Sequence, residues 1–173
     1  MKLSRIFFGL TLAATVLCGQ GLFAQSTDTD SQVFTVVVGD AISITAPADV
    51  LINHNLTDNN QVFAEQPWNV FTSNPTGAAV TLDMGRFVLD TDSTFFRDAS
   101  MALAMLSTDS TANWAVTTAA GTTAGSGTAS VAAGSTGPGS GQLGLTVTFI
   151  ESDASTLAAG NYVATVVGTI TNN

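Results

Sequence analysis

The sequence predicts an all-β protein that folds as an antiparallel β-sandwich. Two segments alternate apolar and small polar residues with the period of two that a half-buried strand requires. In residues 143–149 every second position is apolar, and residues 162–171 repeat the pattern. Turn-forming residues separate such segments about every 8–12 residues, which is the spacing of a β-sandwich.

Several further strands are predicted besides residues 143–149 and 162–171. The segment 101–106 favours a strand over a helix because Met101, Leu103 and Met105 alternate. About nine to eleven strands are expected, in an immunoglobulin-like or jelly-roll-like sandwich, with a closed β-barrel as the alternative. The further strands are expected at 33–38, 41–45, 67–72, 78–84 and 114–118, with shorter ones at 50–53, 86–89 and 128–132.

The predicted strands in turn predict one connecting turn and the residues of the core. Asn74-Pro75-Thr76-Gly77 carries the residues of a type I turn, so it is expected to join 67–72 and 78–84 as an antiparallel hairpin. The apolar faces of the strands define the predicted core, which is Val36, Ile42, Ile44, Val70, Val80, Leu82, Leu103, Val116, Leu145, Val147, Phe149, Tyr162, Val166 and Ile170.

The N-terminus has the layout of a secretory signal peptide. Lys2 and Arg5 precede an apolar run over residues 6–18, and Leu22-Phe23-Ala24 supplies a small residue for cleavage. The run is shorter than the ~20 residues of a comfortable membrane span. We therefore expect residues 1–24 to be removed on export and no membrane insertion of the rest of the chain.

Residues 25–173 have the length of one domain. Cys18 is the only cysteine, so this mature chain forms no disulfide. A polar, acidic arm is expected at 25–32. The segment 121–142 is rich in Gly, Ser, Thr and Ala, and it is expected to be a flexible surface loop.

The charge of the mature chain excludes several kinds of partner. After residue 24 the cations are Arg86 and Arg97, against 13 acidic residues, which gives a net charge of −11. Binding to nucleic acid or to anionic membrane surfaces needs clustered Lys and Arg, so neither is expected.

No combination of residues predicts catalysis or a bound cofactor. His54 is the only histidine, and no nucleophile motif or second histidine accompanies it. It is interpreted as a solvated loop residue. Asp90, Asp92 and Asp98 are weak calcium candidates, because Phe95 and Met101 stand where a calcium loop needs Gly and Glu; a solvated acidic loop is favoured.

The large aromatic residues allow two interpretations. Trp68, Trp114 and Tyr162 would bind a sugar ring if they formed an exposed strip, but on alternating strands they are expected in the core. Asn55-Leu56-Thr57 matches a glycosylation sequon, a motif that is common by chance.

The end of the chain resembles bacterial secreted immunoglobulin-like sandwiches of the fimbrial and spore-coat subunit type. The residues that carry this resemblance are Leu-Thr-Val-Thr-Phe at 145–149 and Leu-Ala-Ala-Gly-Asn-Tyr-Val-Ala-Thr-Val-Val-Gly-Thr-Ile-Thr at 157–171. The resemblance covers roughly the last 30 residues and implies a structural subunit. It transfers no catalytic residue. The missing disulfide departs from many chaperone-assembled pilins.

These observations favour a secreted or cell-surface structural subunit that self-assembles into fibres or a coat. A carbohydrate- or ligand-binding sandwich is the alternative, and an enzyme is not expected. The expected partners are further copies of the chain or an extracellular glycan, outside the cell or in the periplasm. Because residues 33–38 are apolar and uncharged and follow a polar arm, the arm and residues 33–38 together are a candidate donor for strand addition between copies; an internal strand is the alternative.

Overall fold

The computed structural model describes residues 28–173. The predicted signal peptide lies outside the described residues, as does the beginning of the predicted arm. Residues up to Val37 belong to one unit of the structure and Val38–Asn173 to the other.

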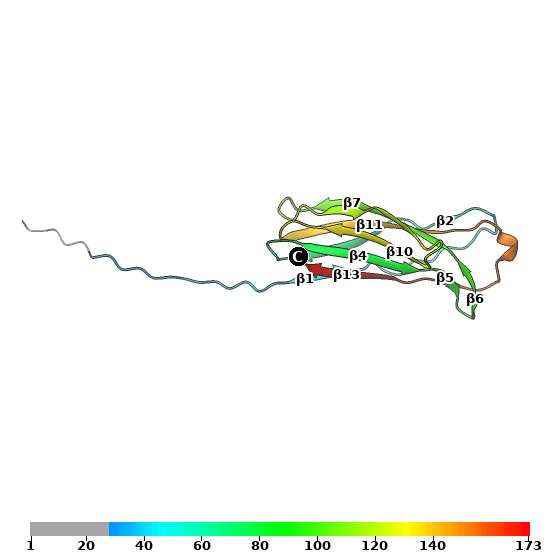
Figure 1. Cartoon of the computed structure of the whole chain (residues 1–173), viewed down its shortest axis with the longest axis horizontal. Helices are drawn as coiled ribbons and strands as arrows, with labels where there is room; N and C mark the ends of the chain where they lie inside the picture. Colours follow the sequence, from blue (N-terminus) through cyan, green and yellow to red (C-terminus); the bar gives the residue numbers. More distant parts are fainter. Residues whose placement is uncertain (1–27) are drawn as a thin grey trace, which may run out of the picture. The chain divides into compact units, whose positions relative to one another are not determined.

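The domain formed by Val38–Asn173 confirms the predicted all-β sandwich (Figure 1). All its strand pairs are antiparallel, as the alternating sequence requires. No helix in the described part of the chain is long and apolar enough to cross a membrane.

The strands form three sheets. Sheet one has the order β1 (Ile42–Thr45), β3 (Gln66–Thr72), β11 (Gly139–Phe149), β7 (Ala99–Thr108) and β9 (Ala120–Thr122), and β2 (Gln61–Val62) also pairs with β11. Sheet two has the order β13 (Val166–Asn172), β4 (Ala78–Gly85), β10 (Thr128–Gly134) and β8 (Ala115–Thr118). The small third sheet contains β12 (Tyr162–Val163), β5 (Phe87–Leu89) and β6 (Asp92–Arg97), and a 3₁₀ turn, η1, covers Ala154–Thr156.

The core lies between sheets one and two. β4 buries Ala78, Val80, Leu82 and Met84 at every second position, while the residues between them face solvent. Most of the predicted core is confirmed as buried or packed against the core. The prediction is wrong for Val36, which is 87% exposed, and for Ile42, which lies at an exposed sheet edge.

The predicted hairpin of 67–72 and 78–84 is wrong, although its turn forms. Gly77 N–H donates to the Asn74 carbonyl at 3.0 Å, and Gly77 takes a positive φ of 86°. The flanking strands β3 and β4 nevertheless belong to different sheets. Both strands carry buried residues that must face the same core from opposite sides, so the turn is an arch between the sheets.

The predicted flexible loop at 121–142 is also wrong. β10 and the first part of β11 occupy half of this segment, in the middle of their sheets, and β10 contains the short strand predicted at 128–132. Ala129, Val131 and Ala133 are buried at alternate positions of β10. The small residues mark close approach of neighbouring chains: a Cβ on Gly141 would lie 2.6 Å from the Trp114 ring.

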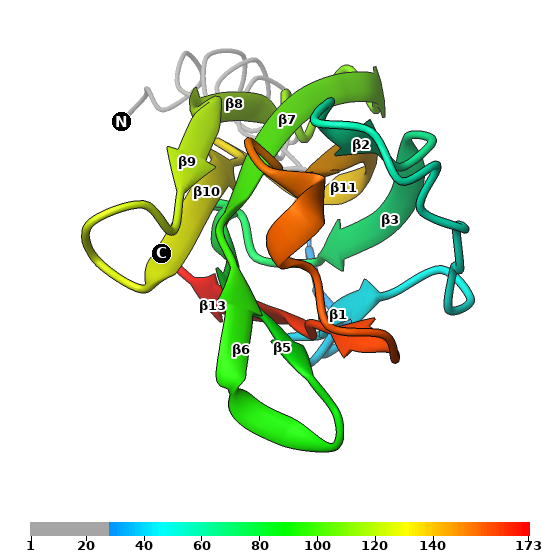
Figure 2. The same cartoon turned by 90° about the vertical axis from the view of Figure 1, so that its right-hand side faces the viewer.

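The two lateral sides of the sandwich are built differently (Figure 2). On one side the chain leaves β8, the edge of sheet two, and enters β9, the edge of sheet one, with only Ala119 between them. On the other side the edges are β1 and β13, which pack side by side without pairing. We call these the closed side and the open side.

Candidate functional site

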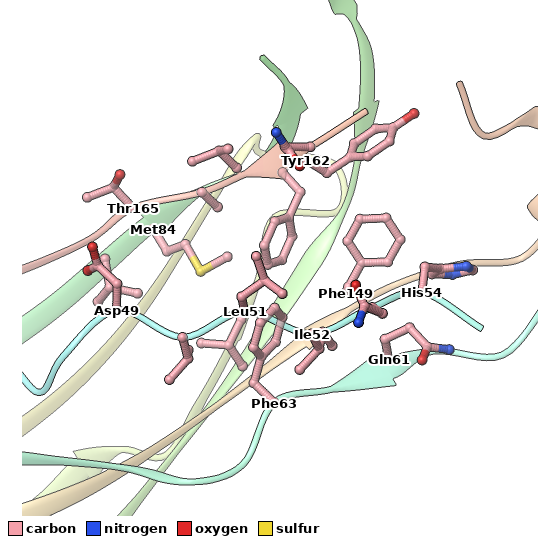
Figure 3. Close-up of a pocket in the computed structure, with 18 of the residues that line it drawn as sticks. Asp49, Leu51, Ile52, His54, Gln61, Phe63, Met84, Phe149, Tyr162 and Thr165 are labelled. Carbon is pink, nitrogen blue, oxygen red and sulfur yellow. The ribbon is translucent and has the colours of Figure 1, made fainter. Parts of the chain in front are cut away.

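An apolar cavity of about 860 Å³ opens on the open side, where β1 has ended. Its floor is formed by core residues of both main sheets and of the third sheet, including Met84, Phe87 and Val147. Two segments border it: residues 46–54, which follow β1, and residues 157–166, which contain β12 (Figure 3).

Aromatic rings line one part of the cavity as a connected cluster. Phe63 and Phe87 stack with ring centroids 5.8 Å apart, and Phe87 lies 5.2 Å from Phe149. Tyr162 meets Phe149 edge to face at 5.7 Å. Such rings offer a large apolar surface to any chain or molecule that enters.

The segment 46–54 crosses the open side without joining either sheet, and we call it the strap. In residues 28–173 no hydrogen bond involves the backbone of the strap. Pro47 lacks an N–H and holds Ala46 in extended backbone, which helps to end β1 here. Leu51 is 80% exposed, and Val50 and Ile52 are also exposed although the sequence is apolar. The prediction of a strand at 50–53 is therefore wrong, because these residues have no partner strand.

His54 ends the strap, and its interpretation as a solvated loop residue is wrong. Its ring packs edge-on against Phe149 at 5.7 Å. Nδ1 accepts a hydrogen bond from Leu56 N–H at 3.0 Å, so the ring proton is on Nε2. Within the described residues Nε2 is buried and has no hydrogen-bond partner.

The loop after His54 is tied to the segment that follows β11. Leu56 has a positive φ of 57°, and Thr57 donates to the Asn55 carboxamide oxygen at 2.6 Å. The sequon is thus exposed in a compact turn. Asn60 accepts from Glu151 N–H, and Asp58 accepts from Ala154 N–H at 2.8 Å. These bonds join the loop after the strap to the segment that leads to residues 157–166.

A buried ion pair anchors residues 150–156, which lead from β11 to the cavity border at 157–166. Arg97 Nε donates to Glu151 Oε2 at 2.7 Å, and the Glu151 side chain is almost completely buried. Burial alone would raise the pKa of Glu151, but the Asp153 and Ser152 N–H groups and the Arg97 guanidinium outweigh it and lower the pKa below its ordinary value. Arg97 also donates to Thr156 at 2.6 Å, which fixes η1.

The other end of the cavity is closed by direct contact between the sheets. A Cβ on Gly168 of β13 would lie 2.7 Å from the Trp68 ring and 2.8 Å from Ile44 of β1. The absence of a side chain at Gly168 therefore lets β1 and β13 approach. Beyond Thr45 this contact stops, and the strap and the cavity begin.

The structure does not bring the calcium candidates together. Asp90 accepts from Asn161 at 3.1 Å, and Asp92 accepts from Thr94 within its own turn. Asp98 is engaged by Arg86 at 2.8 Å and by the Thr123 hydroxyl. Among residues 28–173 no group of three or more His, Cys, Asp or Glu side chains is arranged to hold a metal ion.

The aromatic residues considered for sugar binding do not form an exposed strip. Trp68 and Trp114 are buried in the core, as predicted. Tyr162 is half-buried, and its hydroxyl accepts a hydrogen bond from Ala158 N–H at 3.2 Å. Other aromatic rings are exposed both at the cavity and outside it; Phe96, for example, is 43% exposed and does not line the cavity.

Residues 33–38 form no strand, so their prediction as a strand of the sandwich is wrong. Val33, Phe34, Val36, Val37 and Val38 are 81–88% exposed. We call residues 33–38 the apolar stretch. Just after it, Ser73 holds the chain that leads into β1: Ala41 N–H donates to Ser73 Oγ at 2.7 Å, and Ser73 N–H donates to the Ala41 carbonyl at 2.8 Å.

Searches with the sequence and the structure find no matching family model, no similar curated protein and no similar solved structure. Sequence reasoning singled out the apolar stretch but missed the strap and the cavity. The available signal was the run Val50-Leu51-Ile52, which is apolar yet does not alternate.

Proposed function

We propose that the protein is a secreted or cell-surface structural subunit that assembles with further copies of itself through the apolar stretch at residues 33–38. The observation that carries the proposal is the exposure of five large apolar side chains in six consecutive residues. Exposed apolar patches of this kind mark interaction sites in soluble proteins. Covering them would stabilise a complex by roughly 1.5 kcal/mol or more per side chain.

The chemistry of the stretch fits pairing with a strand of another molecule. It contains four valines, a phenylalanine and a threonine, all of which favour extended backbone. It has no proline and no charge, the two features that commonly protect an exposed strand from pairing. Main-chain hydrogen bonds and alternate side chains would then provide affinity and specificity together.

The cavity favours a second candidate function, which is binding of an apolar small molecule. A volume of about 860 Å³ is within the range of ligand sites, roughly 300–1,000 Å³. Asp49, His54 and Gln61 lie at its rim and would contact polar ends of a ligand (Figure 3). This function would leave the apolar stretch unexplained, so we place it second.

Light scattering and negative-stain microscopy of the expected mature chain, residues 25–173, test the proposal. We expect filaments or concentration-dependent oligomers. Deleting residues 25–38 should give a folded monomer, because none of the described residues in that segment is buried. Intact assemblies of the truncated chain would place the contact elsewhere. A mature chain that stays monomeric at high concentration and high salt would contradict self-assembly.

A further inference from the structure

We propose that the outer face of sheet one, the face turned away from the core, binds a neutral sugar. The sugar ring stacks on the exposed Phe71 ring, and its hydroxyl groups bond to polar side chains beside it. This site is separate from both the apolar stretch and the cavity, so it does not rest on the proposed self-assembly.

Phe71 is an aromatic residue that the fold places outside the core. Its neighbours in β3, Val70 and Thr72, are buried, so Phe71 points to the outer face of the sheet. Its side chain is 37% exposed. An aromatic ring in this position offers a flat apolar surface, on which the C–H face of a sugar ring can stack.

The strands on both sides of Phe71 contribute hydroxyl groups. In the register of sheet one Phe71 lies opposite Ser43 of β1 and opposite Ser140 of β11. Directly opposite residues of antiparallel strands share a face, with Cβ atoms about 5 Å apart. Both serines are exposed, so their hydroxyls can reach a ligand that covers the ring.

A polar pocket of about 190 Å³ adjoins Phe71 on the same face. Every residue that lines it is polar or glycine: Asn69, Ser107, Thr108, Asp109, Ser140, Gly141 and Gln142. The pocket is smaller than the roughly 300–1,000 Å³ of enclosed ligand sites, so it receives one polar edge of a ligand that lies across the sheet.

Two carboxamides in this pocket are paired and oriented. Gln142 lies opposite Asn69 in the sheet, and its Nε2 donates to Asn69 Oδ1 at 3.0 Å. The bond uses one donor of Gln142 and one acceptor of Asn69. The pair therefore keeps the Asn69 amide as a donor and the Gln142 carbonyl oxygen as an acceptor for sugar hydroxyls.

Asp109 supplies a charged acceptor whose position is fixed by the backbone. Its Oδ2 accepts from Ser140 N–H at 2.7 Å, and its own N–H donates to the Ser140 carbonyl at 3.0 Å. Its carbonyl accepts from Asn113 N–H at 2.9 Å in the turn after β7. A carboxylate accepts several hydrogen bonds, so exposed Asp109 keeps capacity for a ligand hydroxyl. The site is thus ordered before a ligand arrives, which lowers the cost of binding.

The charges favour a neutral sugar over other ligands that stack on aromatic rings. Among the described residues that line the pocket, the charged one is Asp109. Arg86 and Arg97, the cations of the mature chain, are engaged by Asp98 and Glu151. With a net charge of −11, the mature chain repels phosphate and carboxylate groups, so nucleotides and acidic sugars are disfavoured.

A glycan array tests the ligand class with the mature chain. The array carries neutral mono- and disaccharides together with sialylated counterparts. We expect retention on neutral sugars, and retention about tenfold weaker on the sialylated counterpart of the same sugar. Failure to bind any neutral sugar would overturn the proposal, as would stronger retention on the sialylated forms.

Paired phenylalanine substitutions locate the bound sugar. Phe71→Ala removes the stacking ring, and Phe96→Ala removes a ring of β6 that is 43% exposed and lies outside the site. For the neutral sugar retained best, titration calorimetry should show binding weakened about tenfold by Phe71→Ala and less than about twofold by Phe96→Ala. Phe71→Trp should retain binding, because it keeps an aromatic surface. Unfolding curves check that each variant is folded. Equal binding by Phe71→Ala and Phe96→Ala would overturn the site.

Asp109→Asn tests the polar side of the site. The carboxamide oxygen can still accept from Ser140 N–H, so the melting temperature should stay unchanged while sugar binding weakens several-fold. Asp83→Asn, on the outer face of sheet two, is the matched control. Unchanged binding by Asp109→Asn would overturn its role as an acceptor. Light scattering of the same samples reports self-assembly separately, so failure of sugar binding and failure of self-assembly are distinguished.

Discussion

The closed and open sides of the sandwich differ in how the chain continues at the edges of the two main sheets. On the closed side the chain steps from β8 to β9, and Leu103 N–H donates to the carbonyl of Ala119 at 2.8 Å, so even the crossing residue is hydrogen-bonded. On the open side β1 ends after four residues and the strap continues with no backbone hydrogen bond among the described residues.

The difference shows where stability and where binding capacity lie in this domain. The closed side has Gly121 against the Ser130 backbone and a buried Thr123, whose hydroxyl bonds Asp98 and Ala99. These contacts bind the crossing segment to both main sheets. The open side keeps apolar surface and backbone groups available, which is what an intermolecular contact needs.

The largest expected effect comes from removing a core ring near the closed side. Trp114 precedes β8 and is buried, and its Nε1–H donates to the Gly139 carbonyl at 3.3 Å. We expect Trp114→Ala to lower the free energy of unfolding by about 3–5 kcal/mol. Urea denaturation measures this change. A loss below about 1 kcal/mol would show that the closed side is not the rigid part of the domain.

A second substitution tests the close approach of the sheets on the closed side. A Cβ on Gly121 would lie 2.5 Å from the Ser130 carbonyl oxygen, so Gly121→Val forces the backbones apart. We expect a loss of about 2 kcal/mol or more. Gly85→Val is the matched control, because no atom lies within 4 Å of the added Cβ. Similar melting temperatures for the two variants would contradict the close approach.

The contribution of the Arg97–Glu151 ion pair, which anchors the segment after β11, can be tested through pH. Because the pKa of Glu151 is lowered in the folded state, its stabilisation is present above its ordinary pKa and is lost as the pH falls through the lower value. We expect Glu151→Gln to cost about 1–3 kcal/mol at neutral pH.

The difference between wild type and Glu151→Gln should therefore shrink on acidification below about pH 4.5. Thermal unfolding from pH 7 to pH 3 follows it, with exposed Glu65→Gln as control. A difference that stays constant over this range would mean that the charge of Glu151 contributes nothing.

The smallest effect is expected in the strap. Leu51→Ser should change the free energy of unfolding by less than about 0.5 kcal/mol, because Leu51 is exposed and its backbone is unpaired. Hydrogen exchange sharpens the comparison: amides of the strap should exchange far faster than those of β7, which is paired on both edges. Slow exchange of the strap in the isolated monomer would show that it is already paired.

The fold class was predictable from the sequence because alternation reports burial of one strand face. The alternation pattern predicted β4, β11 and β13 correctly, because the apolar row of each strand meets an opposing sheet. It failed in two opposite cases. Residues 121–142 looked like a loop around one short strand at 128–132, because Ala and Gly bury little area. The short strand is confirmed within β10, and β10 and β11 fill narrow space in the sheets.

Residues 33–38 looked like a strand, yet they are exposed. Local pattern does not specify which partner covers an apolar face, so neither the strap nor the cavity could be located before the sheets were known. His54 is a further example: its contact with Phe149 joins residues that are distant in sequence. The resemblance of residues 145–171 to fimbrial and spore-coat subunits stays a prediction.

The hydrogen bonds between Ser73 and Ala41 determine how a pulling force on the preceding segment enters the domain. A pull on residues before Gly39 reaches the domain at the two Ala41–Ser73 hydrogen bonds and then at the four residue pairs between β1 and β3. Antiparallel hydrogen bonds run perpendicular to the strands, so a force along β1 loads them together in shear and does not open them one at a time. The short edge strand is thereby suited to carry tension from the preceding segment into the centre of sheet one.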